Sequence, residues 1–299
     1  MDNLKNLTII IVTYKTEKRI LYNCIKSIDA NIKIIVVENS NNEEFKSQVL
    51  KDFENVDVIL SNTNLGYGGG NNLGLKYVKT NFVMISNPDT VYDKNFFKNL
   101  SVYLNSNIKF SIIGASYNDE NYLPYGSFDS KLNNYLKKID YDDNNLKEVD
   151  WVVGCTMILN LKEINFEKVF DDSFFLFYDE TDLCFRVKSK NGKIYNSSKL
   201  IVDHLGHKSS QSSDPRFKIK SEKLRNWHLM WSSFYYHKKH YGYFFSVRKN
   251  IGKLFRSFFK MLYFKIKNEE EKKVIYKYRF LGLINSMIGK NSWYRINDN

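Results

Sequence analysis

Residues 7–14 read LTIIIVTY, an apolar run that ends in a threonine and a tyrosine. Such a run is typical of a strand that is buried on both faces of a parallel sheet. Three more runs follow: IKIIVVE at 32–38, VDVIL at 56–60 and FVMIS at 82–86. Helices are expected between them, over residues 17–30 (Ile20, Cys24 and Ile28 share one face), 43–52 and 69–79. The order βαβαβαβ predicts a doubly wound, mainly parallel α/β sheet.

The later sequence alternates less regularly. Residues 117–148 are polar and are expected to form loops over the sheet. Strands are expected within VDWVVGCTMILN (149–160) and KLIVDH (199–204), and a helix is expected to begin near Glu180, with Leu183, Cys184 and Val187 on one side. From Pro215 the chain becomes helical, aromatic and basic. We therefore expect an α/β domain over residues 1–215 and a helical region over residues 216–299.

Composition narrows the class of protein. The cysteines are Cys24, Cys155 and Cys184, an odd number without CxxC spacing, so neither a zinc site nor a disulfide framework is expected and a reducing cytosol is the natural compartment. The first fifteen residues lack the pattern of a signal peptide, and no run approaches the roughly 18 apolar residues of a membrane-spanning helix. The net charge is +12, and residues 241–299 carry 13 Lys and Arg against 4 Asp and Glu.

Polar side chains follow each of the first four predicted strands. They are Thr13 and Tyr14, then Glu38 and Asn39, then the stretch SNTNLGYGGGNNLG (61–74), and then Asn87-Pro88-Asp89. Ligands of open α/β sheets bind beyond the carboxyl ends of the strands. We therefore expect a binding site at this edge of the sheet.

Five of the 14 glycines lie between Gly66 and Gly74. A loop of this composition lets backbone amides approach a phosphate or a sugar closely. The spacing matches neither the dinucleotide fingerprint nor a Walker A loop. A flexible connection is the alternative interpretation.

Pro88 is one of only three prolines in the chain. It fixes its own φ and pushes Asn87 toward an extended backbone, so the strand should end in a rigid turn that presents Asn87 and Asp89. Two oxygen-bearing side chains in this arrangement suit a hard cation and a diphosphate that it bridges. The alternative is an ordinary turn in which Asp89 caps a helix near residue 93.

A second acidic cluster, Asp179, Glu180 and Asp182, follows five apolar or aromatic residues. A carboxylate next to such a wall suits a general base. Acids also favour the first turn of a helix, and Asp182 could pair with Arg186 one turn later, so at least one of the three is expected to be structural. His204, at the end of a predicted strand, is either a metal ligand beside Asp89 or a core or capping histidine.

Taken together, these pieces resemble the inverting nucleotide-sugar glycosyltransferases of family 2, which have the GT-A fold, and within them the bacterial rhamnosyltransferase-like branch that builds surface polysaccharides such as capsule and O-antigen. The similarity spans roughly residues 7–210 and rests on IIIVTYK (9–15), VVENS (36–40), NTNLGYGGGNNLG (62–74), SNPDT (86–90), FFLFYDETDLCFRVKSKNGKIY (174–195) and VDHLGHKSS (202–210).

The resemblance implies roles for the residues at these positions. Residues of the nucleoside pocket would be Thr13, Tyr14, Glu38 and Asn39, and those near the nucleotide and sugar would be Asn64, Gly66, Asn71 and Asn72. Asn87 and Asp89 would stand at the family's Asp-x-Asp position, and Asp89 and His204 would bind Mg²⁺ or Mn²⁺. Glu180 would be the catalytic base, with Asp179 and Asp182 beside it.

The sequence departs from the family pattern at three places. Asn87 replaces the first aspartate of the Asp-x-Asp motif, and Glu38 stands where aspartate is usual. The family's Glu-Asp pair is reversed here as Asp179-Glu180, so either carboxylate could take the proton.

The resemblance also implies a reaction and its partners. The donor would be a nucleoside-diphosphate sugar, first of all dTDP-L-rhamnose, with UDP-hexoses as alternatives. The acceptor would be a hydroxyl of a lipid-linked saccharide at the inner face of the cell membrane. A degenerate, non-catalytic sugar-nucleotide binder is a further alternative.

The basic C-terminal region predicts a surface helix over residues 243–264. One face carries Phe244, Val247, Ile251, Leu254, Phe255, Phe258 and Leu262, and the other carries Lys249, Lys253, Arg256 and Lys260, while Arg248 lies on the apolar side. Such a helix suits an anionic, cytoplasmic membrane surface, which would make the protein peripheral to the membrane. The alternatives are packing on the α/β domain or on a second subunit in a homodimer. Nucleic-acid binding is not expected, because the basic residues are interleaved with apolar ones at helical spacing and no recognised motif is present.

Overall fold

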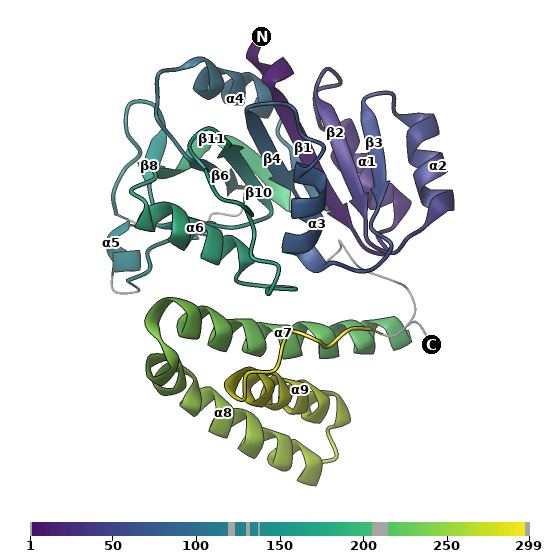
Figure 1. The fold of residues 1–299 in the computed structure, drawn as a ribbon, viewed down its shortest axis with the longest axis vertical. Coiled ribbons are helices and arrows are strands. Elements are labelled where there is room, and N and C mark those ends of the chain that lie inside the picture. Colours follow the sequence, from purple (N-terminus) through teal and green to yellow (C-terminus); the bar gives the residue numbers. More distant parts are fainter. Residues whose placement is uncertain (1, 119–122, 130–131, 137, 205–214, 297–299) are drawn as a thin grey trace. The chain divides into compact units, whose positions relative to one another are not determined.

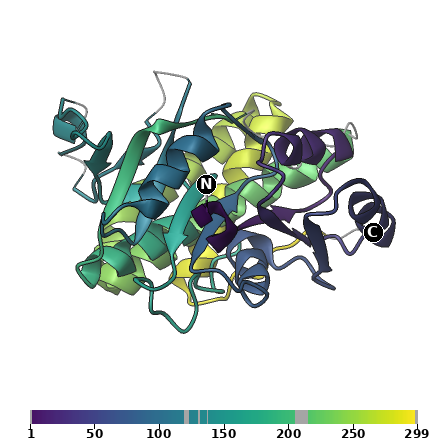
Figure 2. The same cartoon turned by 90° about the horizontal axis from the view of Figure 1, so that it is seen from above.

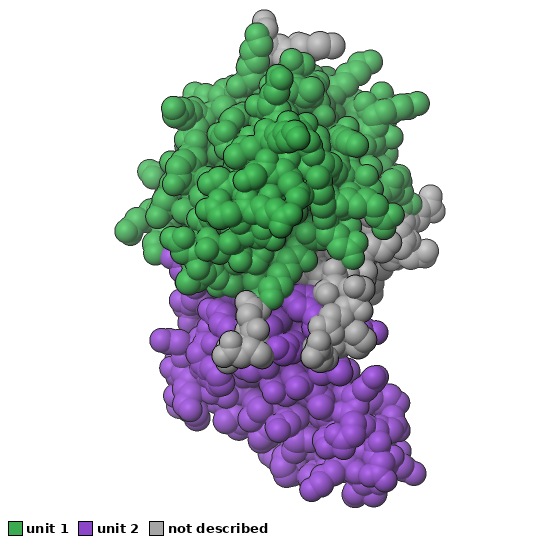
Figure 3. Space-filling view, turned by 90° about the vertical axis from the view of Figure 1, so that its right-hand side faces the viewer, with its two compact units in different colours: residues 1–170, 180–211 green, residues 171–179, 212–299 purple. Residues whose placement is uncertain are grey.

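The computed structural model describes residues 2–118, 123–129, 132–136, 138–204 and 215–296. The chain divides into two compact units, which Figure 3 shows in different colours. The first, called the sheet unit here, comprises Met1–Phe170 and Glu180–Gln211. The second, called the helical unit, comprises Asp171–Asp179 and Ser212–Asn299.

The sheet unit contains four parallel strands at one side of a mixed sheet. They are β1 (Leu7–Thr13), β2 (Lys33–Glu38), β3 (Val56–Leu60) and β4 (Phe82–Ser86). The sheet continues through β10 (Thr156–Asn160), β6 (Ile112–Tyr117), β11 (Ile194–His204) and β5 (Thr90–Tyr92) in the order β3-β2-β1-β4-β10-β6-β11-β5, and β8 (Leu146–Glu148) pairs with β11. β10 runs antiparallel to both of its neighbours. The predicted doubly wound, mainly parallel α/β sheet is confirmed.

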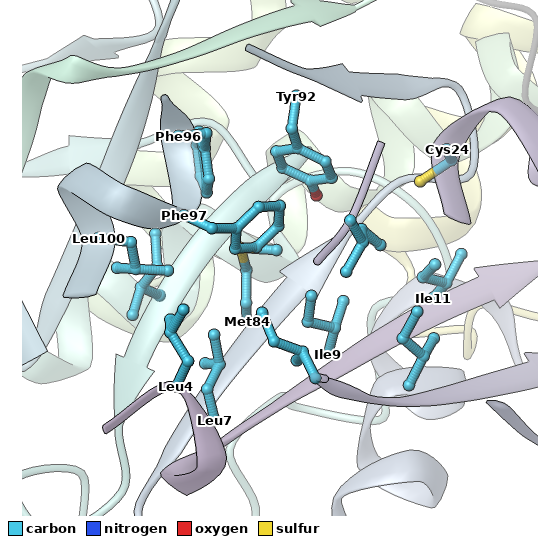
Figure 4. Close-up of a cluster of buried hydrophobic side chains, with 14 of the residues drawn as sticks. Leu4, Leu7, Ile9, Ile11, Cys24, Met84, Tyr92, Phe96, Phe97 and Leu100 are labelled. Carbon is cyan, nitrogen blue, oxygen red and sulfur yellow. The ribbon is translucent and has the colours of Figure 1, made fainter. Parts of the chain in front are cut away.

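Helices cover both faces of this sheet (Figure 1, Figure 2). One face packs against α1 (Lys18–Lys26), α2 (Glu43–Asp52) and α4 (Phe96–Asn105), and the other against α3 (Gly66–Leu75) and α6 (Asp179–Ser189). β1 shows why its sequence is apolar throughout: Ile9 and Ile11 enter the first core and Ile10 enters the second. Figure 4 shows the first core, in which Ile9 and Met84 lie near Tyr92 and Phe97.

Several elements differ from the prediction. Residues 117–148, predicted as loops, also contain β7 (Tyr125–Gly126), α5 (Asn133–Leu136) and β8, which are too short to show a hydrophobic period. The stretch 149–160 forms β9 (Trp151–Val152), which pairs with β7, and β10. The helix predicted over residues 69–79 is α3, which begins at Gly66, so the glycine-rich segment is helical and is not the flexible connection of the alternative interpretation.

The helical unit is built from three helices, α7 (Pro215–Tyr241), α8 (Tyr243–Ile266) and α9 (Glu270–Met287). Gly242 has φ 86° at the turn between α7 and α8, a conformation that favours glycine. Residues 171–179 belong to this unit because they bind α7: Ser232 Oγ donates to Leu176 O at 2.8 Å. No helix in the described part of the chain is both long and apolar enough to cross a membrane.

Candidate functional site

The carboxyl ends of β1 and β2 are tied to the start of α3. Thr13 and Glu38 are register partners, and Asn39 N donates to Thr13 O at 2.8 Å. Asn39 Nδ2 donates to Gly66 O at 3.0 Å, while Asn39 Oδ1 is buried and has no hydrogen-bond partner among the described residues. Tyr14, half-buried, follows directly after β1. The structure therefore brings these predicted nucleoside residues together at one edge of the sheet.

Glu38 orders the turn that follows β2. The side chain is buried, and its two oxygens accept from Ser40 N at 3.0 Å and from Asn42 N at 2.7 Å. Asn42 in turn caps α2, since its Oδ1 accepts from Phe45 N at 2.9 Å. One observed role of Glu38 is thus to shape the loop at the predicted nucleoside pocket.

The glycines of α3 allow the helix to lie directly on the sheet. A Cβ at Gly70 would lie 2.7 Å from Val12 Cγ1, and a Cβ at Gly74 would lie 2.8 Å from Ile10 Cγ2. Neither distance is compatible with a real side chain. These glycines therefore serve close packing, and only Gly66, with φ 76° and its N–H bonded to Asn64 Oδ1 at 3.0 Å, serves the turn into the helix.

Two predicted donor residues of α3 have different surroundings. Asn71 is fully buried, its Nδ2 donates to Tyr67 O at 3.1 Å, and its Oδ1 has no partner among the described residues. Asn72 is engaged with the backbone of Phe170, because its Nδ2 donates to Phe170 O at 2.8 Å and its Oδ1 accepts from Phe170 N at 3.0 Å. Asn72 therefore anchors the end of the 161–170 segment in this structure.

The Asn-Pro-Asp turn is held from several sides. Asn87 N donates to Cys155 O at 2.9 Å, and Asn87 O accepts from Ser86 Oγ at 3.0 Å and from Thr90 N at 3.3 Å. β5 begins at Thr90, and the next helix, α4, begins only at Phe96, so the alternative in which Asp89 caps a helix near residue 93 is wrong. Residues 90–92 pair with β11 as a strand, so they do not form the first turn of a helix.

This pairing brings His204 to Asp89. Thr90 and His204 are register partners, and His204 Nε2 lies 3.3 Å from Asp89 Oδ1 and 3.5 Å from Asn87 Nδ2. The Asp89 side chain is 1% exposed and that of His204 is 24% exposed. A buried carboxylate and a partly exposed imidazole thus lie side by side just beyond the carboxyl end of β4. The rest of the histidine-containing motif, residues 205–210, lies outside the described residues.

Cys155 follows Gly154, whose Cβ position is next to Glu180, and its carbonyl accepts from Asn87 N at 2.9 Å. Burial raises the pKa of its thiol to about 12, and the charges of Asp89 and Glu180 act in the same direction. Tyr117 OH is hydrogen-bonded to Cys155 Sγ, and its ring packs on that of His204 with the centroids 5.9 Å apart. Cys155 is therefore an uncharged thiol close to both carboxylates and not a nucleophile.

The three acids of α6 have different surroundings. Asp182 is fully buried, and its Oδ2 accepts from Arg186 Nε at 2.8 Å. Arg186 also donates to the carbonyls of Lys168 and Val169. This arrangement is the expected pair one helical turn apart, and it gives Asp182 a structural role. Asp179 is buried, and Glu180 is half-buried.

Glu180 is next to a backbone segment that contacts α3. A Cβ at Gly154 would lie 3.2 Å from Glu180 Cβ and 2.9 Å from Tyr67 OH, and the Tyr67 hydroxyl donates to Gly154 O. Sequence reasoning missed Tyr67, Gly154, Tyr117 and Cys155. Tyr67 lies inside a quoted motif, but nothing in the sequence indicates that its hydroxyl would reach residue 154.

The backbone immediately before α6 is strained. Phe177 and Tyr178 have φ 66° and 68°, a left-handed conformation that is rare for aromatic residues and costs about 1–3 kcal/mol for each residue. Within the helical unit Tyr178 OH donates to Ser233 Oγ at 3.3 Å. Strain of this kind clusters at functional sites, and here it lies directly before the acidic helix.

The residues present fit a divalent cation in part. No group of three or more His, Cys, Asp and Glu side chains within the described ranges is arranged to hold a metal. Asp89 and His204 supply an oxygen and a nitrogen ligand that lie side by side. A two-residue set suits an ion whose other ligands are water and the phosphates of a substrate.

The comparisons with known proteins agree with this architecture. The family model described as Glycosyl transferase family 2 matches residues 8–165, a range that ends before Glu180 and His204. The chain is 29% identical over 200 residues to the low-salt glycan biosynthesis hexosyltransferase Agl10 of Haloferax volcanii, covering 63% of each protein. It is 24% identical over 247 residues to the rhamnosyltransferase WbbL of Escherichia coli K12, covering 74% of this chain and 89% of WbbL.

Two solved structures share the fold. GalNAc-T7 with UDP, GalNAc and Mn²⁺ matches with a TM-score of 0.57 and 12% identity over 78% of this chain and 50% of that one. The mannosyltransferase PcManGT of Pyrobaculum calidifontis, in complex with GDP-Man and Mn²⁺, matches with a TM-score of 0.56 and 10% identity over 94% of this chain and 87% of that one. The GT-A fold and the family that the motifs predicted are confirmed: the chain belongs to glycosyl transferase family 2.

Proposed function

We propose that the sheet unit transfers a sugar from a nucleoside-diphosphate donor to a hydroxyl group, with inversion at the anomeric carbon. The observation that carries this proposal is that the segment Gly154–Cys155 contacts both acidic motifs, because Asn87 N donates to Cys155 O at 2.9 Å and a Cβ at Gly154 would lie 3.2 Å from Glu180 Cβ. Asp89 is paired with a histidine, and Glu180 lies in the first turn of α6. A diphosphate site and a general base are the two functions that a single displacement requires.

The nucleoside would bind at the ends of β1 and β2. Asn39 Oδ1 and Asn71 Oδ1 are buried acceptors without a partner among the described residues. Such atoms are costly to leave unsatisfied, and a ligand N–H or hydroxyl would satisfy them. Thr13, Tyr14 and Glu38 would complete this part of the site.

The diphosphate would bind at the end of β4. Asp89 and His204 would hold Mg²⁺ or Mn²⁺, which would neutralise the charge that develops on the departing diphosphate. Asn87 would lie beside them, since its Nδ2 is 3.5 Å from His204 Nε2. Mn²⁺ is the first ion to test because it accompanies the ligands in both solved structures of this fold.

Glu180 would act on the acceptor. Its carboxylate would take the proton of the acceptor hydroxyl while that oxygen bonds to the anomeric carbon and the diphosphate leaves with the bonding electrons. Of the three acids, Asp182 is committed to Arg186 and Asp179 is buried, whereas Glu180 is half-buried and accessible to a ligand. This difference supports Glu180 as the base.

The names of the relatives support an order in which donors can be tested. The name rhamnosyltransferase for WbbL supports dTDP-L-rhamnose as the first donor to test, and the name hexosyltransferase for Agl10 supports UDP-hexoses as the second. The chain spans 63% of the length of Agl10. We propose a hydroxyl of a lipid-linked saccharide as the acceptor.

The test is a turnover assay with a panel of nucleotide sugars and Mn²⁺, in which release of the nucleoside diphosphate is measured with and without acceptor extract. Glu180→Gln should lower kcat by about 10²–10⁴-fold and leave the donor KM unchanged. Glu163→Gln, the same substitution at an exposed position, should behave as the unmodified protein. Donor binding without turnover in the unmodified protein would favour a non-catalytic sugar-nucleotide binder instead.

A further inference from the structure

The helix α8 is arranged with its polar residues inward and many of its apolar residues outward. Its buried residues are Ser246, Asn250 and Ser257, whereas the exposed large apolar residues are Tyr243, Phe244, Phe245, Phe255, Phe259, Leu262, Tyr263 and Ile266. A surface helix of a globular protein normally shows the opposite arrangement. Specific contacts must therefore hold α8 in this orientation, and its exposed apolar side chains indicate a binding surface.

The cause is a chain of hydrogen bonds that joins α8 to α7 within the helical unit. Ser246 Oγ donates to Phe234 O at 2.7 Å, and Ser233 Oγ donates to Asn250 Oδ1 at 3.1 Å. Lys253 Nζ donates to Ser233 Oγ at 3.0 Å and to Asn250 Oδ1 at 3.1 Å. A buried polar seam of this kind specifies one orientation of the helix, because any rotation would leave these groups unpaired.

Six of the exposed apolar side chains lie along one side of α8, which we call the aromatic face. It consists of Phe244, Phe255, Phe259, Leu262, Tyr263 and Ile266, which fall within about 100° of arc at 100° per helical residue. Phe244 is 86% exposed and Ile266 is 80% exposed. The predicted apolar face is partly wrong, because Val247, Ile251, Leu254 and Phe258 are half-buried and Phe259 and Ile266 take their place. Single exposed apolar residues are ordinary, but a row of six along one helix marks an interaction surface.

The charges of α8 indicate what covers this face. The helix carries six Lys and Arg residues and no Asp or Glu. Arg248 lies within the aromatic face, and Lys249 and Arg256 are exposed along one edge of it. A second copy of the chain would bring the same cations against these three residues, and like charges in a self-complementary contact repel. An anionic lipid surface complements both the charge and the aromatic side chains.

We propose that the aromatic face of α8 lies in the interfacial region of an anionic membrane, with the helix axis parallel to the surface. Phenylalanine and isoleucine side chains enter the boundary of the acyl chains, and Arg248, Lys249 and Arg256 contact the lipid phosphates. The polar seam with α7 keeps the aromatic face directed outward. This proposal does not depend on the sugar-transfer reaction.

The test is sedimentation of the full chain with vesicles of phosphatidylcholine and phosphatidylglycerol or of phosphatidylcholine alone. The protein should bind the anionic vesicles, and the triple variant Phe255→Ser, Phe259→Ser, Ile266→Ser should bind them at least about 100-fold more weakly. Lys249→Glu with Arg256→Glu should weaken binding by about fivefold or more for each charge and remove the preference for phosphatidylglycerol.

Matched controls separate this effect from a general loss of apolar surface. Val102→Ser and Ile219→Ser remove exposed apolar side chains from α4 and α7 and should leave vesicle binding unchanged. Circular dichroism should show the same helix content in all variants. If the triple variant bound anionic vesicles as tightly as the unmodified protein, the proposal would be overturned. It would also be overturned if light scattering showed that the unmodified protein and the control variants are dimers and that the triple variant is a monomer.

Discussion

Asp182 and Glu180 lie two residues apart on α6, and we expect them to have different roles. Replacing Asp182 by asparagine keeps the volume of the side chain but removes the charge that pairs with Arg186 at 2.8 Å. Breaking a buried pair in this way destabilises a protein by about 3–5 kcal/mol. Because the Arg186 side chain is 20% exposed and keeps its bonds to two carbonyl groups, we expect the lower end, about 3 kcal/mol.

The assay is paired thermal unfolding and donor turnover for Asp182→Asn and Glu180→Gln. A loss of about 3 kcal/mol corresponds to a fall of about 6–12 °C in the Tm of a unit of this size. Asp182→Asn should show this fall and should retain most of its turnover well below its Tm. Glu180→Gln should unfold within about 0.5 kcal/mol of the unmodified protein, since no buried ion pair is broken, and should lose turnover.

The opposite pattern would refute this assignment. If Asp182→Asn were as stable as the unmodified protein but inactive, Asp182 would belong to the reaction and its bond to Arg186 would be incidental. If Glu180→Gln retained full turnover, Asp179 would remain as the candidate base, and Asp179→Asn would be the next variant to measure.

Two further predictions concern packing and pH. Gly74→Ala should lower the free energy of unfolding, measured by urea titration, by about 1–3 kcal/mol, because the added Cβ would lie 2.8 Å from Ile10 Cγ2. Gly252→Ala is the control. Its Cβ would meet nothing within 4 Å, so this substitution should raise the free energy of unfolding by about 0.5–1 kcal/mol. Burial lowers the pKa of His228 to about 3, so the imidazole stays neutral in the folded state while the unfolded state binds a proton below about pH 6.5. Unfolding free energy should therefore fall from pH 6.5 toward pH 3 by up to about 1.4 kcal/mol per pH unit from this group, and His228→Gln should flatten that slope in a pH series of urea titrations; an unchanged slope would contradict the burial argument.

Much of the first half of the fold could be predicted because its strands are apolar on both faces. Ile9, Ile10 and Ile11 all become buried, and a run of that kind has few alternatives. The helix predicted from residue 69 begins three residues earlier, at Gly66, a start that is hard to predict because glycine is a poor helix former. Tertiary packing overrides this preference, since only glycine lets α3 lie against Val12 and Ile10.

The candidate site could be predicted less completely. Polar residues at strand ends are visible in a sequence, so Asn39, Asp89 and His204 were identified. Contacts between distant segments are not visible, and the pairing of β5 with β11, which brings His204 to Asp89, was not foreseen. The inward polar seam of α8 also escaped prediction, because a helical projection shows which residues share a face but not which face is buried.

The most direct test of the account is calorimetric binding of dTDP-L-rhamnose and of UDP-hexoses to the unmodified protein and to Asp89→Asn, each with and without Mn²⁺. The account predicts that one donor binds the unmodified protein, that Mn²⁺ tightens this binding, and that Asp89→Asn loses at least about tenfold in affinity and most of the effect of Mn²⁺, since a charged ligand of the metal is removed. The same donor affinity in both proteins, or a donor affinity that does not change when Mn²⁺ is added, would contradict the assignment of Asp89 and His204 to the diphosphate site.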